Sequence, residues 1–190
     1  MGIHRILSQI SQGLQLNSYW DDLRVSVNSL KVPTVNPPAW TAYKGSQVLA
    51  FEDQAVEGNE EIVYFLVQLP HCWKYGSDLM AHVHWVCEDN TAGNCRWKLT
   101  YSWANIDGTF PTESTLTVDA AAGGAADTHV LGNLGAIDGD GKTLSSMLIC
   151  SLSRNSSHAN DTLTGKDAYL LEIDFHYEID SFGSDNEYSD

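Results

Sequence analysis

A strict two-residue alternation in the second half of the chain constrains the fold more than any other feature. In "CRWKLTYSWA" apolar and aromatic side chains alternate with polar ones from Cys95 to Trp103, and "LMAHVHWVC" and "AYLLEIDFHYEID" have the same period. Successive side chains of a β-strand point to opposite faces, so each stretch predicts a strand with one face in a core. Since no long stretch has helical period, we expect an all-β protein.

Three further stretches add to this pattern. "EEIVYFLVQLP", "TESTLTV" and "TLSSMLICSLSR" also predict strands, and segments rich in Gly, Asn, Asp and Ser separate them. Short strands joined by such turns predict an antiparallel β-sandwich, with the jelly roll as the expected form and an immunoglobulin-like arrangement as the alternative. "EDNTAGN" lies between the strands predicted at 79–87 and 95–104, and its turn residues predict a hairpin there.

The N-terminal segment has a different pattern and suggests a separate role. Residues 1–18 predict a short amphipathic helix or arm that needs a partner surface. The candidate partner-binding residues are its apolar side chains at helical spacing, Ile3, Ile6, Leu7 and Ile10. The sandwich domain is expected over 19–182, followed by an acidic tail at 183–190. Residues 30–40, "LKVPTVNPPAW", carry three of the five prolines, which predicts an extended crossing segment.

The charge balance limits the kinds of partner. Lys and Arg total 10 against 25 Asp and Glu, a formal net charge of -15, which disfavours nucleic acid and anionic membranes and favours a neutral or basic protein surface. No secretory leader and no apolar run of membrane-spanning length is evident, so a soluble, unprocessed protein is expected. The four cysteines form no Cys-x-x-Cys pair, so buried free thiols are expected rather than a structural zinc site.

Two histidines raise the question of a metal site. His82 and His84 lie two positions apart on a predicted strand, so they share a face and could bind one ion together. A third ligand could come from His176 or Asp174 if the last strand lies beside this one. Open catalytic metal sites need three protein ligands, so the preferred interpretation is that both histidines are hydrogen-bonded sheet residues and that no cofactor binds.

The same stretch resembles the first motif of cupin metalloproteins. Gly76, His82, His84 and Glu88 match it, but the second cupin motif needs a proline, and none follows Pro111. A cupin-like metal-binding enzyme, with His82, His84 and His176 as ligands, therefore remains an alternative only. No Gly-x-Ser-x-Gly elbow occurs, and we expect a protein that is not an enzyme.

A second resemblance covers most of the chain, from about Tyr19 to Glu187. The segments "YWDDLRV", "VQLPHCWKYGSDLMAHVHW", "LTYSWANI", "SSMLICSLSR" and "LLEIDFHYEIDSFGS" resemble a family of tailed-bacteriophage virion proteins. The resemblance implies a component of the virus particle rather than a reaction. It also implies that the histidines are recurring parts of a structural motif.

Within the virion, two roles are expected from the resemblance. The first is a capsid decoration, or cement, protein, made in the host cytoplasm and bound to the outer surface of the shell as a homotrimer that clamps the major capsid protein. In that role the N-terminal arm would contact the shell, and many weak contacts would act together. The alternative is the head domain of a tail fibre or spike that displays loops 119–128 and 153–165 to a host surface glycan.

Overall fold

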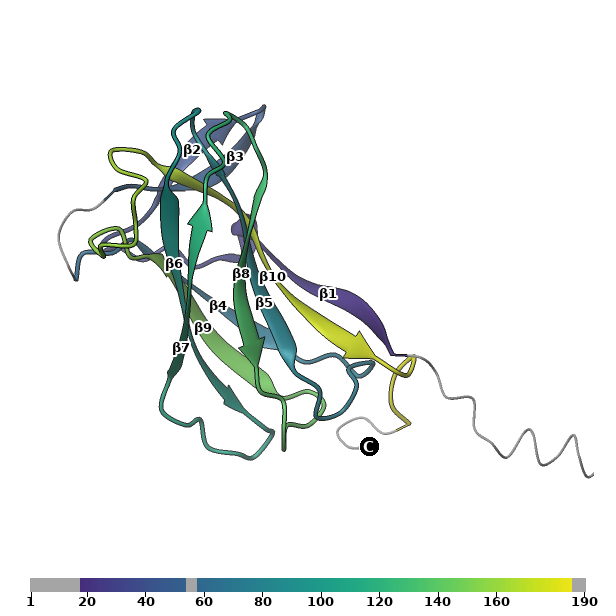
Figure 1. Ribbon diagram of the computed structural model, residues 1–190. Coiled ribbons are helices and arrows are strands. Elements are labelled where there is room, and N and C mark those ends of the chain that lie inside the picture. The colour runs from purple at the N-terminus through teal and green to yellow at the C-terminus, as the bar shows by residue number, and fades with distance from the viewer. Residues whose placement is uncertain (1–17, 54–57, 186–190) are drawn as a thin grey trace, which may run out of the picture.

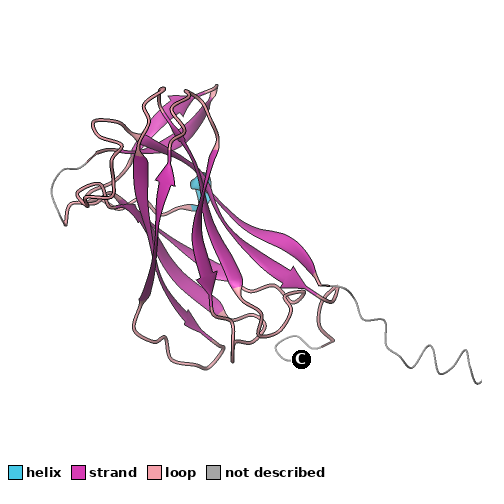
Figure 2. Cartoon of the chain, viewed as in Figure 1, coloured by secondary structure: helices cyan, strands magenta, loops and turns pink. Residues whose placement is uncertain are grey.

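The chain forms a sandwich of two antiparallel β-sheets, as Figures 1 and 2 show for a computed structural model that describes residues 18–53 and 58–185. The strands are β1 (Tyr19–Ser26), β2 (Ala39–Tyr43), β3 (Ser46–Phe51), β4 (Ile62–Gln68), β5 (Leu79–Cys87), β6 (Asn94–Ala104), β7 (Ser114–Ala121), β8 (Val130–Ile137), β9 (Met147–Arg154) and β10 (Ala168–Ile179). A 3-10 turn, η1 (Val27–Ser29), is the helical element of the described ranges. These ranges contain no helix with the length and apolar character to cross a membrane.

The strand order is that of a jelly roll. One sheet contains β3-β10-β5-β8 and the other β4-β9-β6-β7, so the eight strands from β3 to β10 are distributed over the two sheets in the jelly-roll sequence. β2 extends the first sheet beside β3, and β1 pairs with β10, which makes this sheet six-stranded. The predicted fold class is confirmed.

The long strand β10 organises the six-stranded sheet. On one side it pairs with β5; on the other, residues 168–170 pair with β3 and residues 172–179 pair with β1. The last strand therefore lies beside the strand that carries the two histidines, which was the condition for a third ligand. Figure 1 shows β1 running along the C-terminal part of β10.

Aromatic and aliphatic side chains fill the space between the sheets. Trp85 on β5 and Trp97 on β6 are fully buried, with ring centres 6.2 Å apart, and Phe51 packs edge-on against Trp97. The expected free thiols are present: Cys87, Cys95 and Cys150 are buried, and Cys72 is half-buried. Burial raises the pKa of Cys150 to about 12, so this thiol stays protonated.

The hairpin predicted between residues 79–87 and 95–104 is wrong. β5 pairs with β10 and β8, whereas β6 pairs with β7 and β9, so residues 88–93 carry the chain from one sheet to the other. A tight turn and a crossing between sheets use the same turn residues, and the local sequence does not distinguish them.

The proline-rich segment behaves as an extended crossing. After β1 and η1 the chain leaves the six-stranded sheet. Lys31 then forms two backbone hydrogen bonds with Tyr64, at the edge of the four-stranded sheet, before the chain returns to β2. The predicted arm, with Ile3, Ile6, Leu7 and Ile10, and the last five residues of the predicted tail lie outside the described residues.

Candidate functional site

A cluster of imidazoles and one carboxylate lies on the outer face of the six-stranded sheet. Val83 points into the core, so its neighbours His82 and His84 point away from it. β10 pairs with β5 so that Asp174 is directly opposite His82, and His176 lies two residues further along the same face. We call His82, His84, Asp174 and His176 the histidine cluster.

Asp174 is the centre of this cluster. Its Oδ1 lies 3.3 Å from His82 Nδ1, and its Oδ2 lies 3.1 Å from His84 Nε2 and 3.3 Å from His176 Nε2. The rings of His82 and His176 are in edge-on contact, with centres 4.3 Å apart. One carboxylate therefore contacts three imidazoles from two strands.

Two further residues extend the cluster. β1 places Asp22 opposite His176, and Asp22 Oδ1 lies 3.1 Å from His176 Nε2. His129 lies just before β8, and its Nε2 atom is 2.7 Å from His84 Nδ1. Sequence reasoning did not place Asp22 in the site, and it considered His129 only as a histidine without the context of a second cupin motif. The two aspartates of "YWDDLRV" are evident in the sequence, but only the pairing of β1 with β10 places Asp22 beside the histidines.

The inner part of the cluster is shielded from water. His82 is 6% exposed and Asp174 is 5% exposed. Burial lowers the pKa of His82, and the nearby His176 acts in the same direction, while Asp174 opposes both. His82 Nδ1 and Asp174 Oδ1 are buried and make no hydrogen bond, although they face each other.

The predicted metal-ligand residues are thus brought together, but not in the sandwich interior. Trp85, Val83 and Ala81 occupy the core side of β5, whereas the two histidines face outward. The preferred interpretation, that His82 and His84 are polar sheet residues with partners on the acidic face of the last strand, agrees with His84 but leaves His82 Nδ1 without a hydrogen bond.

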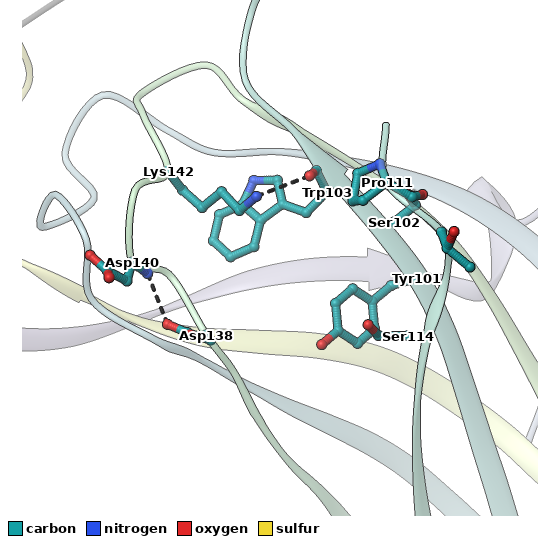
Figure 3. Close-up of a pocket in the computed structure, with 9 residues that line it drawn as sticks. Tyr101, Ser102, Trp103, Pro111, Ser114, Asp138, Asp140 and Lys142 are labelled. Atoms are coloured by element: carbon teal, nitrogen blue, oxygen red, sulfur yellow. Dashed lines mark hydrogen bonds between the residues drawn. The ribbon is translucent and has the colours of Figure 1, made fainter. Parts of the chain in front are cut away.

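A pocket of about 280 Å³ opens at the end of the sandwich where loops 105–113 and 138–146 meet (Figure 3). Lys142 Nζ donates to the backbone carbonyl of Trp103 at 3.1 Å and lies 5.5 Å from the centre of its ring. Asp138 accepts the backbone N–H of Asp140 at 2.9 Å. The pocket therefore combines aromatic surface with carboxylates. Its lining residues are Tyr101, Ser102, Trp103, Pro111, Thr112, Ser114, Asp138, Asp140 and Lys142.

Loops 119–128 and 153–165, expected as display loops, meet each other elsewhere. Asn160 Nδ2 donates to Asp119 at 2.7 Å. Residues 119–121 belong to β7, and the rest of that segment leads to β8 from the end of β7 opposite to loop 105–113. The two loops are therefore at the other end of the sandwich from the pocket.

His71 and Ser145 form a pair near the pocket that sequence reasoning also missed. Ser145 Oγ lies 2.9 Å from His71 Nε2, and Ser184 Oγ lies 2.6 Å from His71 Nδ1. Both ring nitrogens thus contact serine hydroxyls, and Ser145 itself is buried. The arrangement joins the β4–β5 loop, the β8–β9 loop and the segment after β10 at this end of the sandwich.

A third surface feature is apolar. On the outer face of the four-stranded sheet, Leu66 and Ile149 are directly opposite each other and Tyr64 lies two residues from Leu66. The exposed fraction is 62% for Leu66, 47% for Ile149 and 44% for Tyr64. They border an open hollow of about 390 Å³ next to Lys31. We call Tyr64, Leu66 and Ile149 the apolar stripe.

Comparison with known proteins supplies no family. No family model and no curated protein matches the sequence. Among solved structures, a Clostridium thermocellum xylanase 10B with CBM22-1 and GH10 modules, complexed with xylohexaose, is 12% identical with a TM-score of 0.40; the match covers 84% of this chain and 28% of that one. The CBM22-1 xylan-binding domain of Paenibacillus barcinonensis Xyn10C is 15% identical with a TM-score of 0.38, over 87% of this chain and 99% of that domain. At this level of similarity the matches do not bear on ligand or activity.

Proposed function

We propose that the protein is a bacteriophage virion structural protein that binds to the outside of the capsid as a decoration protein and stabilises the shell. The apolar stripe is the observation that carries the proposal. Tyr64, Leu66 and Ile149 expose large apolar side chains together on one sheet face of a chain with a net charge of -15. An exposed apolar group of this kind marks a surface for another protein.

The position of the stripe suits such a contact. β4 is an edge strand of its sheet, and the described residues cover its free side at two points: Lys31 pairs with Tyr64, and the Ile62 N–H donates to the Asn36 carbonyl. The outward side chains of the stripe remain exposed. A capsid subunit can therefore lie over the stripe. The sequence resemblance to phage virion proteins supports the same role, with no reaction assigned. The proposal includes assembly of the protein as a homotrimer and binding to the major capsid protein.

Capsid binding and copy number test the proposal. The purified protein should bind empty capsids of the phage that encodes it, and quantitative mass spectrometry of virions should find hundreds of copies. Leu66→Lys combined with Ile149→Lys should weaken capsid binding at least tenfold, because it places two charges in an apolar contact. Val35→Lys is the matched control, since Val35 is exposed but lies in the proline-rich segment. A handful of copies per virion, or equal binding by both variants, would refute the proposal.

A second candidate, the head domain of a tail fibre or spike, is favoured by the end pocket. Tyr101 supplies aromatic surface there beside the buried Trp103, and Asp138 and Asp140 supply carboxylates near it, which is a combination suited to a polar ligand such as a sugar. Host-cell adsorption separates this role from decoration. Tyr101→Ala should abolish adsorption of the isolated protein to host cells while leaving capsid binding intact. Absence of adsorption by the unmodified protein at micromolar concentration would exclude this candidate.

A further inference from the structure

We infer that the histidine cluster is a binding site for one divalent transition-metal ion of the Zn²⁺ type, with His82, Asp174 and His176 as ligands. The ligand atoms that the three residues offer all lie within 4.8 Å of one another. The inference is independent of the virion role, because it depends only on the geometry of the outer face of the six-stranded sheet.

The first argument is the pair of buried atoms without hydrogen bonds. His82 Nδ1 and Asp174 Oδ1 lie 3.3 Å apart, shielded from water, and neither makes a hydrogen bond. Buried polar atoms in folded proteins nearly always have a partner, so this pair needs an explanation. A shared cation supplies one, because it accepts a lone pair from each atom.

The second argument is distance. Zn²⁺ holds imidazole nitrogen and carboxylate oxygen at about 2.0–2.1 Å in tetrahedral geometry, which places neighbouring ligand atoms roughly 3.4 Å apart. The separation is 3.3 Å between His82 Nδ1 and Asp174 Oδ1, and 3.3 Å between His176 Nε2 and Asp174 Oδ2. The two distances involve different oxygens of Asp174, and one ligand atom from each residue lies within 4.8 Å of the others, so small side-chain movements bring all three to an ion.

The third argument is the surrounding shell. His84 Nε2 lies 3.1 Å from Asp174 Oδ2, and its Nδ1 lies 2.7 Å from His129 Nε2, so a chain of imidazoles orients the carboxylate through Oδ2 and leaves Oδ1 facing His82. Metal sites in proteins use outer groups of this kind to fix their ligands. Asp22 Oδ1, 3.1 Å from His176 Nε2, lies on the solvent side and can supply the fourth ligand.

The site would join three strands. His82 belongs to β5, Asp174 and His176 belong to β10, and Asp22 belongs to β1. In the described residues β1 pairs only with β10, so an ion bound by Asp22 and His82 would link this strand to β5 as well. We assign the ion a structural role that joins these strands.

Metal titration of the untagged full-length chain tests the inference. After treatment with EDTA and dialysis, the protein should bind one Zn²⁺ per chain in isothermal titration calorimetry, and its melting temperature should rise by several degrees. Co²⁺ should bind with the visible absorption of a four-coordinate site. Ca²⁺ should not bind there, since it prefers six to eight oxygen ligands.

The variants separate the site from general metal affinity. Asp174→Asn and His176→Gln should each lower Zn²⁺ affinity at least tenfold and remove the Co²⁺ bands. His158→Gln is the control, because His158 lies in the β9–β10 loop away from the cluster. His176 is partly exposed, so its replacement leaves the core intact, and near-ultraviolet circular dichroism confirms the fold of each variant. Zn²⁺ binding below one ion per five chains, or equal affinity in His176→Gln and His158→Gln, would overturn the inference.

Discussion

At the scale of single residues, the group that most needs compensation for its burial is the guanidinium of Arg154. Arg154 is 1% exposed, and its five N–H groups all have acceptors. Two donate to the carboxylate of Asp161, at 3.0 and 2.9 Å, and the others donate to backbone carbonyls of Phe51, Leu163 and Lys166. This network holds the β9–β10 loop against the end of β3.

Removal of the negative partner should therefore be costly. Asp161→Asn leaves the Arg154 charge buried without compensation, and we expect it to lower the free energy of unfolding by about 3–5 kcal/mol in urea denaturation. The matched control is Asp127→Asn, which breaks the exposed pair with Lys44 and should have a much smaller effect, because solvent screens that pair. Equal effects of the two replacements would show that the buried network is not a main source of stability.

A buried carboxyl group gives a pH dependence. Burial raises the pKa of Glu61 to about 7, and the nearby Glu52 and Asp167 add to the rise, while the N–H of Glu52 and the charge of Arg154 oppose it. Since the folded pKa is above the unfolded one, the protonated form favours folding at low pH, and this contribution is lost as the pH rises from about 4.5 to about 7. Glu61→Gln keeps an acceptor for the Glu52 N–H and should flatten the fall in melting temperature over this range. An unchanged pH profile would contradict the assignment.

At the scale of elements, the two-residue alternation predicted which segments are strands but not which strands pair with each other. The alternation around Trp85 and Trp97 correctly placed both side chains in the core, yet the two strands belong to opposite sheets and their rings meet across the sandwich. β8 gave no strand signal because Gly132 and Gly135 interrupt its apolar pattern. The metal-ligand candidates on β5 and β10 could be predicted from strand faces, whereas Asp22 could not, because a register between residues far apart in sequence is not encoded locally.

The loops at the pocket end contain a close backbone contact that permits only glycine. A Cβ at Gly139 would lie 2.0 Å from the carbonyl oxygen of Ser77, and the Gly139 N–H donates to Asp78 Oδ1 at 3.2 Å. Gly139→Ala must push the β4–β5 and β8–β9 loops apart, and we expect about 1–3 kcal/mol of destabilisation in chemical denaturation. Gly123→Ala is the control, because a Cβ there meets open space. If the two variants were equally stable, the contact would not be tight in solution.

At the scale of the whole molecule, the sandwich and its N-terminal segment should separate functionally. The described strands begin at Tyr19, and β1 is held by pairing with β10 from Tyr19 to Ser26. Deletion of residues 1–17 should therefore change the free energy of unfolding by less than about 0.5 kcal/mol, because it removes no residue of the described strands. Under the decoration proposal, the same deletion should weaken capsid binding at least tenfold, because the apolar contacts of the arm are lost.

A finer variant identifies the groups responsible. Replacement of Ile3, Ile6, Leu7 and Ile10 by serine keeps the length of the arm and removes only its apolar side chains. If it matches the deletion in a capsid co-sedimentation assay, those side chains form the contact. If the deletion itself leaves co-sedimentation unchanged, the arm is not the attachment, and the apolar stripe supplies it through the many copies of the protein that engage the shell at the same time.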